Sequence, residues 1–494
     1  MNTFKRLAKN TGVEFLAQVA APACSFVLIL FVARVLRVSG LGKFSIVLSL
    51  FFIFYTISSL GFTHLITREV ARDRSKAGNY LINASFIGLF FSVLMAGAMC
   101  LTAYLLNYSA DTVLAIYILS VSLMPATLAL ICQSICRAFE RFEFVSIPLI
   151  IGSLFKVLLG LLILSKGYGL VELMAVILGS HLLILSMSLY FALRCTGKPL
   201  FRIDFSFCKW IVKTTPTFAL IFIFATIYWN VDILMLSKIK GPMEVGFYSA
   251  AYKLMKVCKI IPMAYLVAFQ PVIFRLFKSS SEKFKTACTK SIKFLFFTTL
   301  PIAVGTTILA DKFIQLFFRN AFLASANALR ILIWTLVPFS IVLVFAYALI
   351  ASNNQKIDLR VNIIGMGCNV GLNLLLIPKL GFLGASIATF ASICIFLTLQ
   401  YAFISKKLFK VNFIEATGKP LISGALMGIF ILLFKQVNLL LLIFLSASVY
   451  VFLLFILRAF SESDIRLLRR LWEKEGGLVL SQGQSSSGYN SSDQ

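Results

Sequence analysis

The chain has 494 residues, of which 60% are hydrophobic and only 13% are charged, and its mean hydropathy is +0.95. Soluble domains carry about twice that charged fraction, so the composition excludes an ordinary soluble enzyme or binding domain. The net charge of +27 resides in lysines and arginines between apolar runs, which favours a membrane topology signal over nucleic-acid binding. With two histidines and ten scattered cysteines, no metal site and no cofactor is expected.

Apolar runs of 18 or more residues recur from one end of the chain to the other, separated by Gly, Asn, Lys or Arg. They predict an all-α polytopic membrane protein with about fourteen transmembrane helices. The first run follows three basic residues and is long enough to stay in the membrane as an anchor. The expected spans centre near residues 24, 54, 92, 123, 154, 182, 226, 260, 300, 336, 366, 393, 427 and 448.

The distribution of basic residues over the loops predicts the topology. Alternate loops, starting with the N-terminus, hold 31 of the 46 lysines and arginines, whereas the opposite loops hold 10 and the spans hold five. Basic loops stay in the cytoplasm, and an even number of spans puts both termini on one side. We therefore expect both termini to be cytoplasmic.

An internal repeat predicts how the spans are organised. A shift of 204 residues places Gly42–Ser45 on Gly246–Ser249, and a shift of 213 aligns later apolar segments. Both shifts skip six spans, so the halves have the same orientation in the membrane. We expect two six-helix lobes, 1–205 and 206–410, related by a pseudo-two-fold axis along the membrane normal, followed by two further helices in 411–460.

The residues after the last span predict two short segments. Residues 461–480 form an expected amphipathic helix, because Ile465, Leu468 and Trp472 share one face and arginines line the other. Such a helix suits the anionic cytoplasmic leaflet. Residues 481–494 are rich in Ser, Gly, Gln and Asn and are expected to be disordered.

The charges at membrane depth gather around residues 229–259. Lys253, Lys256 and Lys259 are spaced by three, so they share one helix face, and Asp232 lies in the preceding span. Hydrocarbon tolerates such charges when they pair or line a wet cavity. We expect Lys253 and Lys256 to line a substrate-binding cavity, with Lys259 either there or at the cytoplasmic interface. Asp232 either forms an ion pair with Lys253 or couples transport to a proton or ion.

Two basic residues of the first half are further candidates. Lys156 lies in the centre of its span and is either a cavity cation or the partner of Glu172. Arg34 ends the first span and is either an interfacial anchor or part of the same cationic site. Together with Lys253 and Lys256, these residues give an excess of positive charge that suits an anionic ligand such as a pyrophosphate.

Polar residues of the second half complete the candidate set. Asn369 and Asn373, one helical turn apart, either hydrogen-bond between helices or contact a sugar, and Tyr248 and Tyr252 are further candidate cavity contacts. No phosphate-binding loop of the ATPase type, G-x-x-x-x-G-K-[ST], occurs in the chain. Any driving force is therefore expected to come from an ion gradient, the substrate's own gradient or a partner.

Several short motifs in a fixed order carry a family resemblance over roughly residues 1–460. They are Ala33–Leu36 with Gly42–Ser45, Ile66–Arg72, Asp232–Leu236 with Gly246–Lys253, and Asn373–Ala385. With these motifs the chain resembles the polysaccharide-export flippases of the multidrug/oligosaccharidyl-lipid/polysaccharide (MOP) superfamily, in particular the Wzx-type O-antigen flippases.

The resemblance implies a V of two six-helix lobes with two extra helices, working by alternating access in the bacterial inner membrane. It also implies the substrate, an undecaprenyl-diphosphate-linked oligosaccharide moved from the cytoplasmic to the periplasmic face. Polysaccharide polymerase and chain-length proteins are implied partners. Related flippases often place arginine in the cavity, whereas lysines dominate here, and lysine offers a point charge instead of a bidentate fork.

Two other functions compete with this interpretation. A multidrug or cation extruder of the same fold needs acids to attract its substrate, and this chain has few acids within its spans. A membrane enzyme such as a glycan polymerase or ligase is expected to carry a large periplasmic loop, and the outward loops here are all short.

Overall fold

The computed structural model describes residues 3–197 and 201–459, and every regular element in these ranges is a helix. The prediction of an all-α fold is therefore confirmed. The amphipathic helix and the tail predicted for 461–480 and 481–494 lie outside the described residues. The α-helices are α1 (Thr3–Ser58), α2 (Phe62–Arg72), α3 (Ala77–Leu105), α4 (Ala110–Val121), α5 (Leu123–Ala138), α6 (Glu143–Ser165), α7 (Leu170–Thr196), α8 (Phe205–Thr214), α9 (Pro216–Lys240), α10 (Pro242–Cys258), α11 (Ile260–Ser279), α12 (Ser281–Phe318), α13 (Ser325–Leu332), α14 (Leu336–Ala351), α15 (Gln355–Lys407), α16 (Phe413–Leu433) and α17 (Leu439–Ile456).

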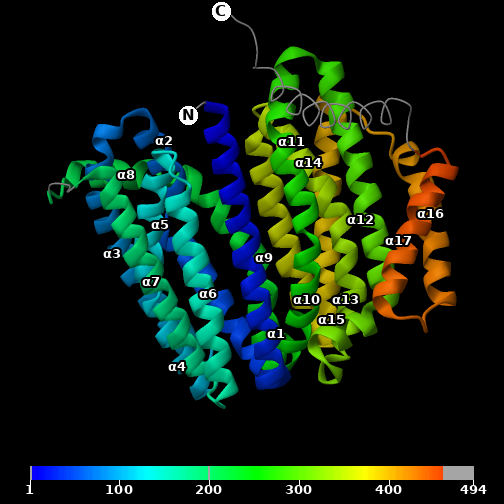
Figure 1. The fold of residues 1–494 in the computed structure, drawn as a ribbon, viewed down its shortest axis with the longest axis horizontal. Coiled ribbons are helices and arrows are strands. Elements are labelled where there is room, and N and C mark those ends of the chain that lie inside the picture. The colour runs from blue at the N-terminus through cyan, green and yellow to red at the C-terminus, as the bar shows by residue number, and fades with distance from the viewer. Residues whose placement is uncertain (1–2, 198–200, 460–494) are drawn as a thin grey trace, which may run out of the picture.

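The two longest helices, α1 and α15, each double back on themselves. In α15 the backbone leaves the helical region at Gly381, and the Gln400 side chain donates to Asp358 at 2.8 Å. These two residues would lie about 63 Å apart in a straight helix. A residue with positive φ likewise breaks α1 at Arg37, and Figure 1 shows α1 running down from the N-terminus and returning towards α2. Each of the two helices is therefore two membrane passes.

The number of membrane passes agrees with the prediction. Ten continuous helical stretches among the described residues are long and apolar enough to cross a membrane, and several of them contain more than one labelled helix. Two of the ten contain the doubled helices α1 and α15. The bent pair formed by α10 and α11 adds one pass, and the shorter apolar stretch of α16 adds another. The total is fourteen, which confirms the prediction of about fourteen transmembrane helices for a multi-pass membrane protein.

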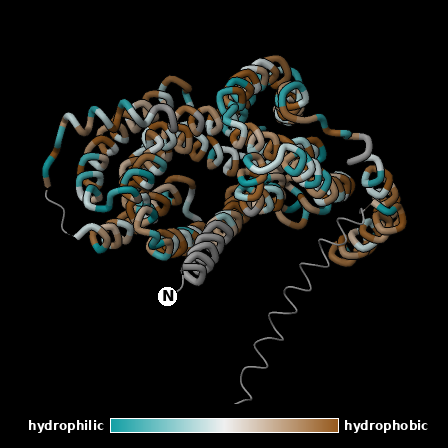
Figure 2. Tube along the Cα trace, turned by 90° about the horizontal axis from the view of Figure 1, so that it is seen from above, coloured by the Kyte–Doolittle hydropathy of each residue, from teal (hydrophilic) through white to brown (hydrophobic). Residues whose placement is uncertain are grey.

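The helices form two groups with α1 and α9 between them. Figure 1 shows α2 to α8 on one side, α10 to α15 on the other, and α16 and α17 at the outer edge. Seen from above, hydrophobic and hydrophilic residues are interspersed along the helices of both groups (Figure 2). The lobe boundaries at 205 and 410, and the pseudo-two-fold axis, stay predictions.

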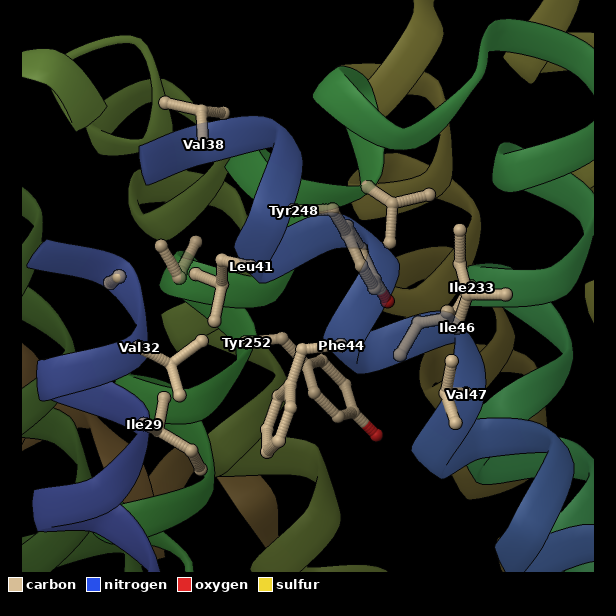
Figure 3. Close-up of a cluster of buried hydrophobic side chains, with 14 of the residues drawn as sticks. Ile29, Val32, Val38, Leu41, Phe44, Ile46, Val47, Ile233, Tyr248 and Tyr252 are labelled. Atoms are coloured by element: carbon tan, nitrogen blue, oxygen red, sulfur yellow. The ribbon is translucent and has the colours of Figure 1, made fainter. Parts of the chain in front are cut away.

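The largest apolar core joins the two groups through α1. It contains Val38, Leu41 and Phe44 of α1 together with Tyr248 and Tyr252 of α10, as Figure 3 shows. Separate cores hold α2, α3, α5 and α8 together, and α11, α12, α14 and α15 together. Helices α16 and α17 pack on α12. The central core thus fixes α9 and α10, which carry the candidate site, against the α1 hairpin.

Candidate functional site

Asp232 of α9 lies at the centre of a buried hydrogen-bond network. Its side chain is only 4% exposed. One carboxylate oxygen accepts hydrogen bonds from the Tyr248 hydroxyl at 2.9 Å and the Thr389 hydroxyl at 2.7 Å. The other accepts from the Asn373 amide at 2.7 Å. The network therefore ties α9 to α10 and to both limbs of α15.

This network differs from the expected contacts of Asp232. Among the described residues, no lysine or arginine nitrogen forms a salt bridge within 4 Å of its carboxylate, so the predicted ion pair with Lys253 is absent there. The reason is geometric: the acid faces the α15 hairpin, where hydroxyl and amide donors replace a cation. Three hydrogen bonds to one carboxylate offset part of the cost of burying it without a counter-ion.

Asn369 and Asn373 belong to the same buried network. Both are fully buried, and the Asn373 amide nitrogen also donates to the Asn369 oxygen at 3.1 Å. The remaining amide atoms, Nδ2 of Asn369 and Oδ1 of Asn373, have no hydrogen-bond partner in the protein. The structure thus places both asparagines beside Asp232 and away from any exposed surface, which favours the first predicted alternative, hydrogen bonding between helices, over contact with a sugar.

Two tyrosines of α10 connect the Asp232 network with the lysines. Tyr248 stacks on Tyr252 with ring centroids 5.4 Å apart, and the Tyr252 hydroxyl donates to the backbone oxygen of Trp229 at 3.3 Å. Both tyrosines are buried, so the structure does not present them as the cavity contacts that the sequence predicted. The Lys256 ammonium lies 5.4 Å from the Tyr252 ring centroid. One side of this aromatic pair therefore meets the acid and the other meets a base.

Lys253 lies on the α10 face that is directed towards the first half of the chain, and Lys256 follows it one turn later. Gly246, seven residues before Lys253, contacts the backbone of Val38 in α1. Two turns separate Gly246 from Lys253, so both point to the same side of the helix. Lys256 is exposed and Lys253 is half-buried. The structure thus leaves both predicted cations at least partly exposed on a membrane-spanning helix, with Lys253 on the side of α10 that meets the first half of the chain.

Lys259 is held differently, between two aromatic rings. Its side chain is 4% exposed, and its ammonium lies 3.9 Å from the ring centroid of Trp229 and 4.4 Å from that of Phe339. Cation–π contacts of this kind stabilise a desolvated ammonium by about 2 kcal/mol or more. Lys259 therefore belongs to the interior of the protein and not to the membrane interface.

Lys156 lies at a similar depth in the first half. Its ammonium donates to the Ser25 hydroxyl at 3.1 Å, whereas the Glu172 carboxylate accepts the Gly169 backbone amide at 2.9 Å. The alternative of a Lys156–Glu172 pair is therefore not what the structure shows. Ser25 is twelve residues, or about 18 Å, from the break in α1, and Lys253 is eleven residues, or about 16 Å, from the start of α10 beside that break.

Arg34 does not share this depth. It is exposed and lies three residues, or about 5 Å, from the break in α1 at Arg37. The structure thus brings Lys156, Lys253 and Lys256 to one level of the membrane and leaves Arg34 near one end of the helices. An interfacial position is the predicted alternative that this geometry favours.

The structure also reveals polar and aromatic residues that were not among the predicted site residues. Thr389 completes the Asp232 network, and Trp229 and Phe339 hold Lys259. In the first half, His181 stacks on Phe51 with centroids 5.3 Å apart, and its Nδ1 has no hydrogen-bond partner in the protein. Of these four residues, only His181 is conspicuous in the sequence, because a histidine is rare within an apolar span.

Comparison with known families and relatives places this geometry in context. A family model described as "Polysaccharide biosynthesis protein" matches residues 7–277, and the MatE model matches residues 217–375. The probable low-salt glycan biosynthesis flippase Agl15 of Haloferax volcanii is 21% identical over 403 residues, covering 81% of this chain and 84% of its own length. The probable lipid II flippase MurJ of Haemophilus influenzae is 28% identical over 133 residues, which is 26% of each chain.

Solved structures show the same fold. The lipid II flippase MurJ in an inward closed conformation matches with a TM-score of 0.74 at 16% identity, covering 89% of this chain and 96% of that one. A multidrug resistance transporter of the MATE family in an inward-facing conformation matches with a TM-score of 0.64 at 15% identity, covering 78% and 94%. At these identities the similarity establishes the fold alone, so the substrate has to be inferred from the residues of the site.

Proposed function

Because the family model spans residues 7–277 of 494, the chain belongs to the polysaccharide biosynthesis protein family, and on that premise we propose its transport function. The protein is a MOP-superfamily transporter of the flippase type and not an enzyme. The proposed substrate is an undecaprenyl-diphosphate-linked oligosaccharide, such as an O-antigen unit. It moves from the cytoplasmic to the periplasmic leaflet of a bacterial inner membrane by alternating access between the two helix groups.

One observation carries this proposal, namely the accessible lysines at membrane depth. Lys253 lies on the side of α10 that meets the first half of the chain, Lys256 follows it one turn later, and Lys156 donates to Ser25 at a similar distance along its helix from the contact between α1 and α10. The nearby acid, Asp232, already accepts three hydrogen bonds and faces the other way. Positive charge without a counter-ion in a water-poor site favours an anionic ligand, and a diphosphate headgroup supplies two phosphates at that depth.

The proposed driving force is an ion gradient acting at Asp232. One carboxylate surrounded by hydroxyl and amide groups suits a proton or a monovalent cation, since oxygen ligands of low total charge match such ions. Rotation of the Asn373 amide would turn its unpartnered oxygen towards the carboxylate and add a ligand. Within the described residues, no three His, Cys, Asp or Glu residues group as a metal site.

A second candidate function is the extrusion of cationic drugs. The match of the MatE model to residues 217–375 and the MATE-type neighbour favour it. Such a substrate requires an accessible acid at membrane depth. Here the acid is buried and the accessible charges are lysines, so the flippase function is the better supported of the two.

Orientation and partners follow from the same proposal. In the proposed topology the chain crosses the membrane fourteen times, and the excess of lysine and arginine in alternate loops favours cytoplasmic termini. A polysaccharide polymerase and a chain-length protein would receive the flipped substrate. Fusion of a reporter that is active on one side only, at Ser352 and at Asn107, tests the orientation. We expect the loop at Ser352 to be cytoplasmic and that at Asn107 periplasmic.

Complementation tests the function. The chain is supplied to bacteria that lack their own O-antigen flippase, and surface glycan and lipid-linked intermediate are quantified by mass spectrometry. We expect surface glycan to be restored and the lipid-linked intermediate at the cytoplasmic face to fall. An unchanged pool of that intermediate, combined with increased resistance to cationic drugs, would instead identify a drug extruder.

A further inference from the structure

Two glycines bring the backbones of α1 and α10 into direct contact. A Cβ atom added at Gly42, just after the break in α1, would overlap the carbonyl oxygen of Pro242 at the start of α10. A Cβ atom added at Gly246 would overlap the carbonyl oxygen of Val38. Only glycine permits backbones to approach this closely. The two halves of the chain therefore meet here without an intervening side chain.

The contact is reciprocal. Val38 and Gly42 precede Pro242 and Gly246 by 204 residues, which is the shift that aligns the repeated motifs. Position 38 of one repeat meets position 246 of the other, and position 42 meets position 242. Such an exchange of equivalent contacts is what an isologous interface on a two-fold axis produces. The axis implied by the repeat would pass between Gly42 and Gly246.

Each glycine is attached more firmly to its own half than to the opposite half. Next to Gly42, Lys43 forms a 2.6 Å ion pair with Asp111 at the start of α4. Near Gly246, the Glu244 carboxylate accepts the backbone amide of Phe382 at 2.8 Å, at the turn within α15. The glycine contact itself is van der Waals packing. Charged bonds therefore lie within the halves, and weaker packing lies between them.

A pair of neutral hydroxyls lies one turn inward from the glycines. Ser45 and Ser249 are again 204 residues apart, both are buried, and neither hydroxyl oxygen has a hydrogen-bond partner among the described residues. A buried unpaired hydroxyl is unfavourable and gains hydrogen bonds when water reaches it. Separation of the two halves at this point would hydrate both serines. The contact is therefore closed but poised to open.

We propose that the Gly42–Gly246 contact is a latch that seals this end of the transport path and separates in every transport cycle. Two hydrogen bonds between the halves flank it: Tyr108 with Ser237 at 2.7 Å, and the Lys238 ammonium with the backbone oxygen of Leu106 at 3.1 Å. Opening breaks these bonds, the glycine packing and the apolar contacts between α1 and α10 around it, but no salt bridge between the two halves within the described residues. The latch serves any substrate, so it does not depend on the identity of the lipid-linked glycan.

Accessibility of Ser45 tests the latch. Ser45→Cys is introduced into the full-length chain after replacement of the ten native cysteines, and a membrane-impermeant maleimide is applied to intact cells and to opened vesicles. In the parent, Ser45→Cys, which is 2% exposed, should react slowly from the latch side. Gly42→Ala or Gly246→Ala should raise that labelling rate at least tenfold, because an added methyl group prevents closure.

Two control glycines separate opening from general damage. Gly384→Ala would overlap the backbone oxygen of Leu376 within one half, so it should lower thermal stability and leave the labelling rate unchanged. Gly367→Ala has no atom within 4 Å and should change neither. A folded Gly246→Ala protein whose labelling equals that of the parent overturns the latch.

A milder variant keeps the test decisive where the alanine variants fail to fold. Tyr108→Phe adds no volume and removes one hydrogen bond between the halves. The loss of one such bond predicts an increase of about fivefold in latch-side labelling. Labelling equal to that of the parent in a folded Tyr108→Phe protein would likewise overturn the proposal.

Discussion

Two groups of charged residues on adjacent helices, the Asp232 network and the lysines of α10, have opposite environments. Asp232 is buried and its carboxylate accepts three hydrogen bonds from α10 and α15, whereas Lys253 and Lys256 are more exposed and have no acid beside them in the described residues. Burial with full hydrogen bonding is the arrangement of a structural or ion-coupling site. Accessibility without a counter-ion is the arrangement of a ligand site.

Lys259 lies between these extremes and sharpens the comparison. It is as buried as Asp232, but aromatic rings in place of hydrogen-bonding groups surround its ammonium. The Trp229 ring contacts Lys259, and the Trp229 backbone oxygen accepts a hydrogen bond from Tyr252. Tyr252 in turn stacks on Tyr248, whose hydroxyl donates to Asp232. A single chain of contacts thus joins the acid to the lysines, and variants at its two ends should behave differently.

The largest effect is expected at the acid. Asp232→Ala leaves donors from Tyr248, Thr389 and Asn373 without an acceptor in a buried site. Unpaired buried groups cost about 1–3 kcal/mol each, so the variant should lose thermal stability and transport together. The measurements are melting temperature in detergent and surface glycan in the complementation assay. Asp232→Asn retains the shape, and normal ion-dependent transport in that variant would exclude Asp232 as the coupling residue.

The accessible lysines should affect transport without affecting folding. Lys253→Ala combined with Lys256→Ala removes two cations that have no acidic partner, so protein level should be unchanged while transport falls at least tenfold. Surface glycan per transporter, measured beside an immunoblot, checks this. The corresponding arginine variants keep the charge and should retain most transport. Lys379→Ala, a change to an exposed lysine outside the candidate site, is the matched control.

Replacement of the caged lysine separates charge from packing. Lys259→Met fills the space between Trp229 and Phe339 with an uncharged chain of similar length, so we expect unchanged or higher thermal stability. Lys259→Ala leaves a cavity and should destabilise the protein. If Lys259→Met also transports normally, the lysine charge has no part in substrate movement. Thermal unfolding and the complementation assay together distinguish these outcomes.

The smallest effect is expected from single hydroxyl deletions. Tyr248→Phe removes one of the three hydrogen bonds to Asp232 and should lower the free energy of unfolding by about 1 kcal/mol. Ser249→Ala removes an unpaired buried hydroxyl next to the latch and should stabilise the closed state by a similar amount. Thermal unfolding measures both, and the opposite signs are the test: a loss of stability in Ser249→Ala would show that its hydroxyl is satisfied.

The sequence alone predicted the membrane class, the number of passes and the cationic character of the site. Hydropathy is summed along a helix, so each span is visible from its own residues without knowledge of its neighbours. The breaks within α1 and α15 were predicted as boundaries between spans for the same reason. Lys253, Lys256 and Asp232 stood out because charges are rare at membrane depth.

Only the tertiary structure decided which groups meet. Thr389 and Asn373 lie 157 and 141 residues from Asp232 along the chain, and nothing local to these residues indicates that they share one carboxylate. The direction of each helix face also depends on packing, which turned Tyr248 and the asparagines inward and left Lys256 exposed. The repeat placed Gly42 and Gly246 at equivalent positions in the sequence. Their direct contact is seen only in the structure, because it depends on how the two halves pack against each other.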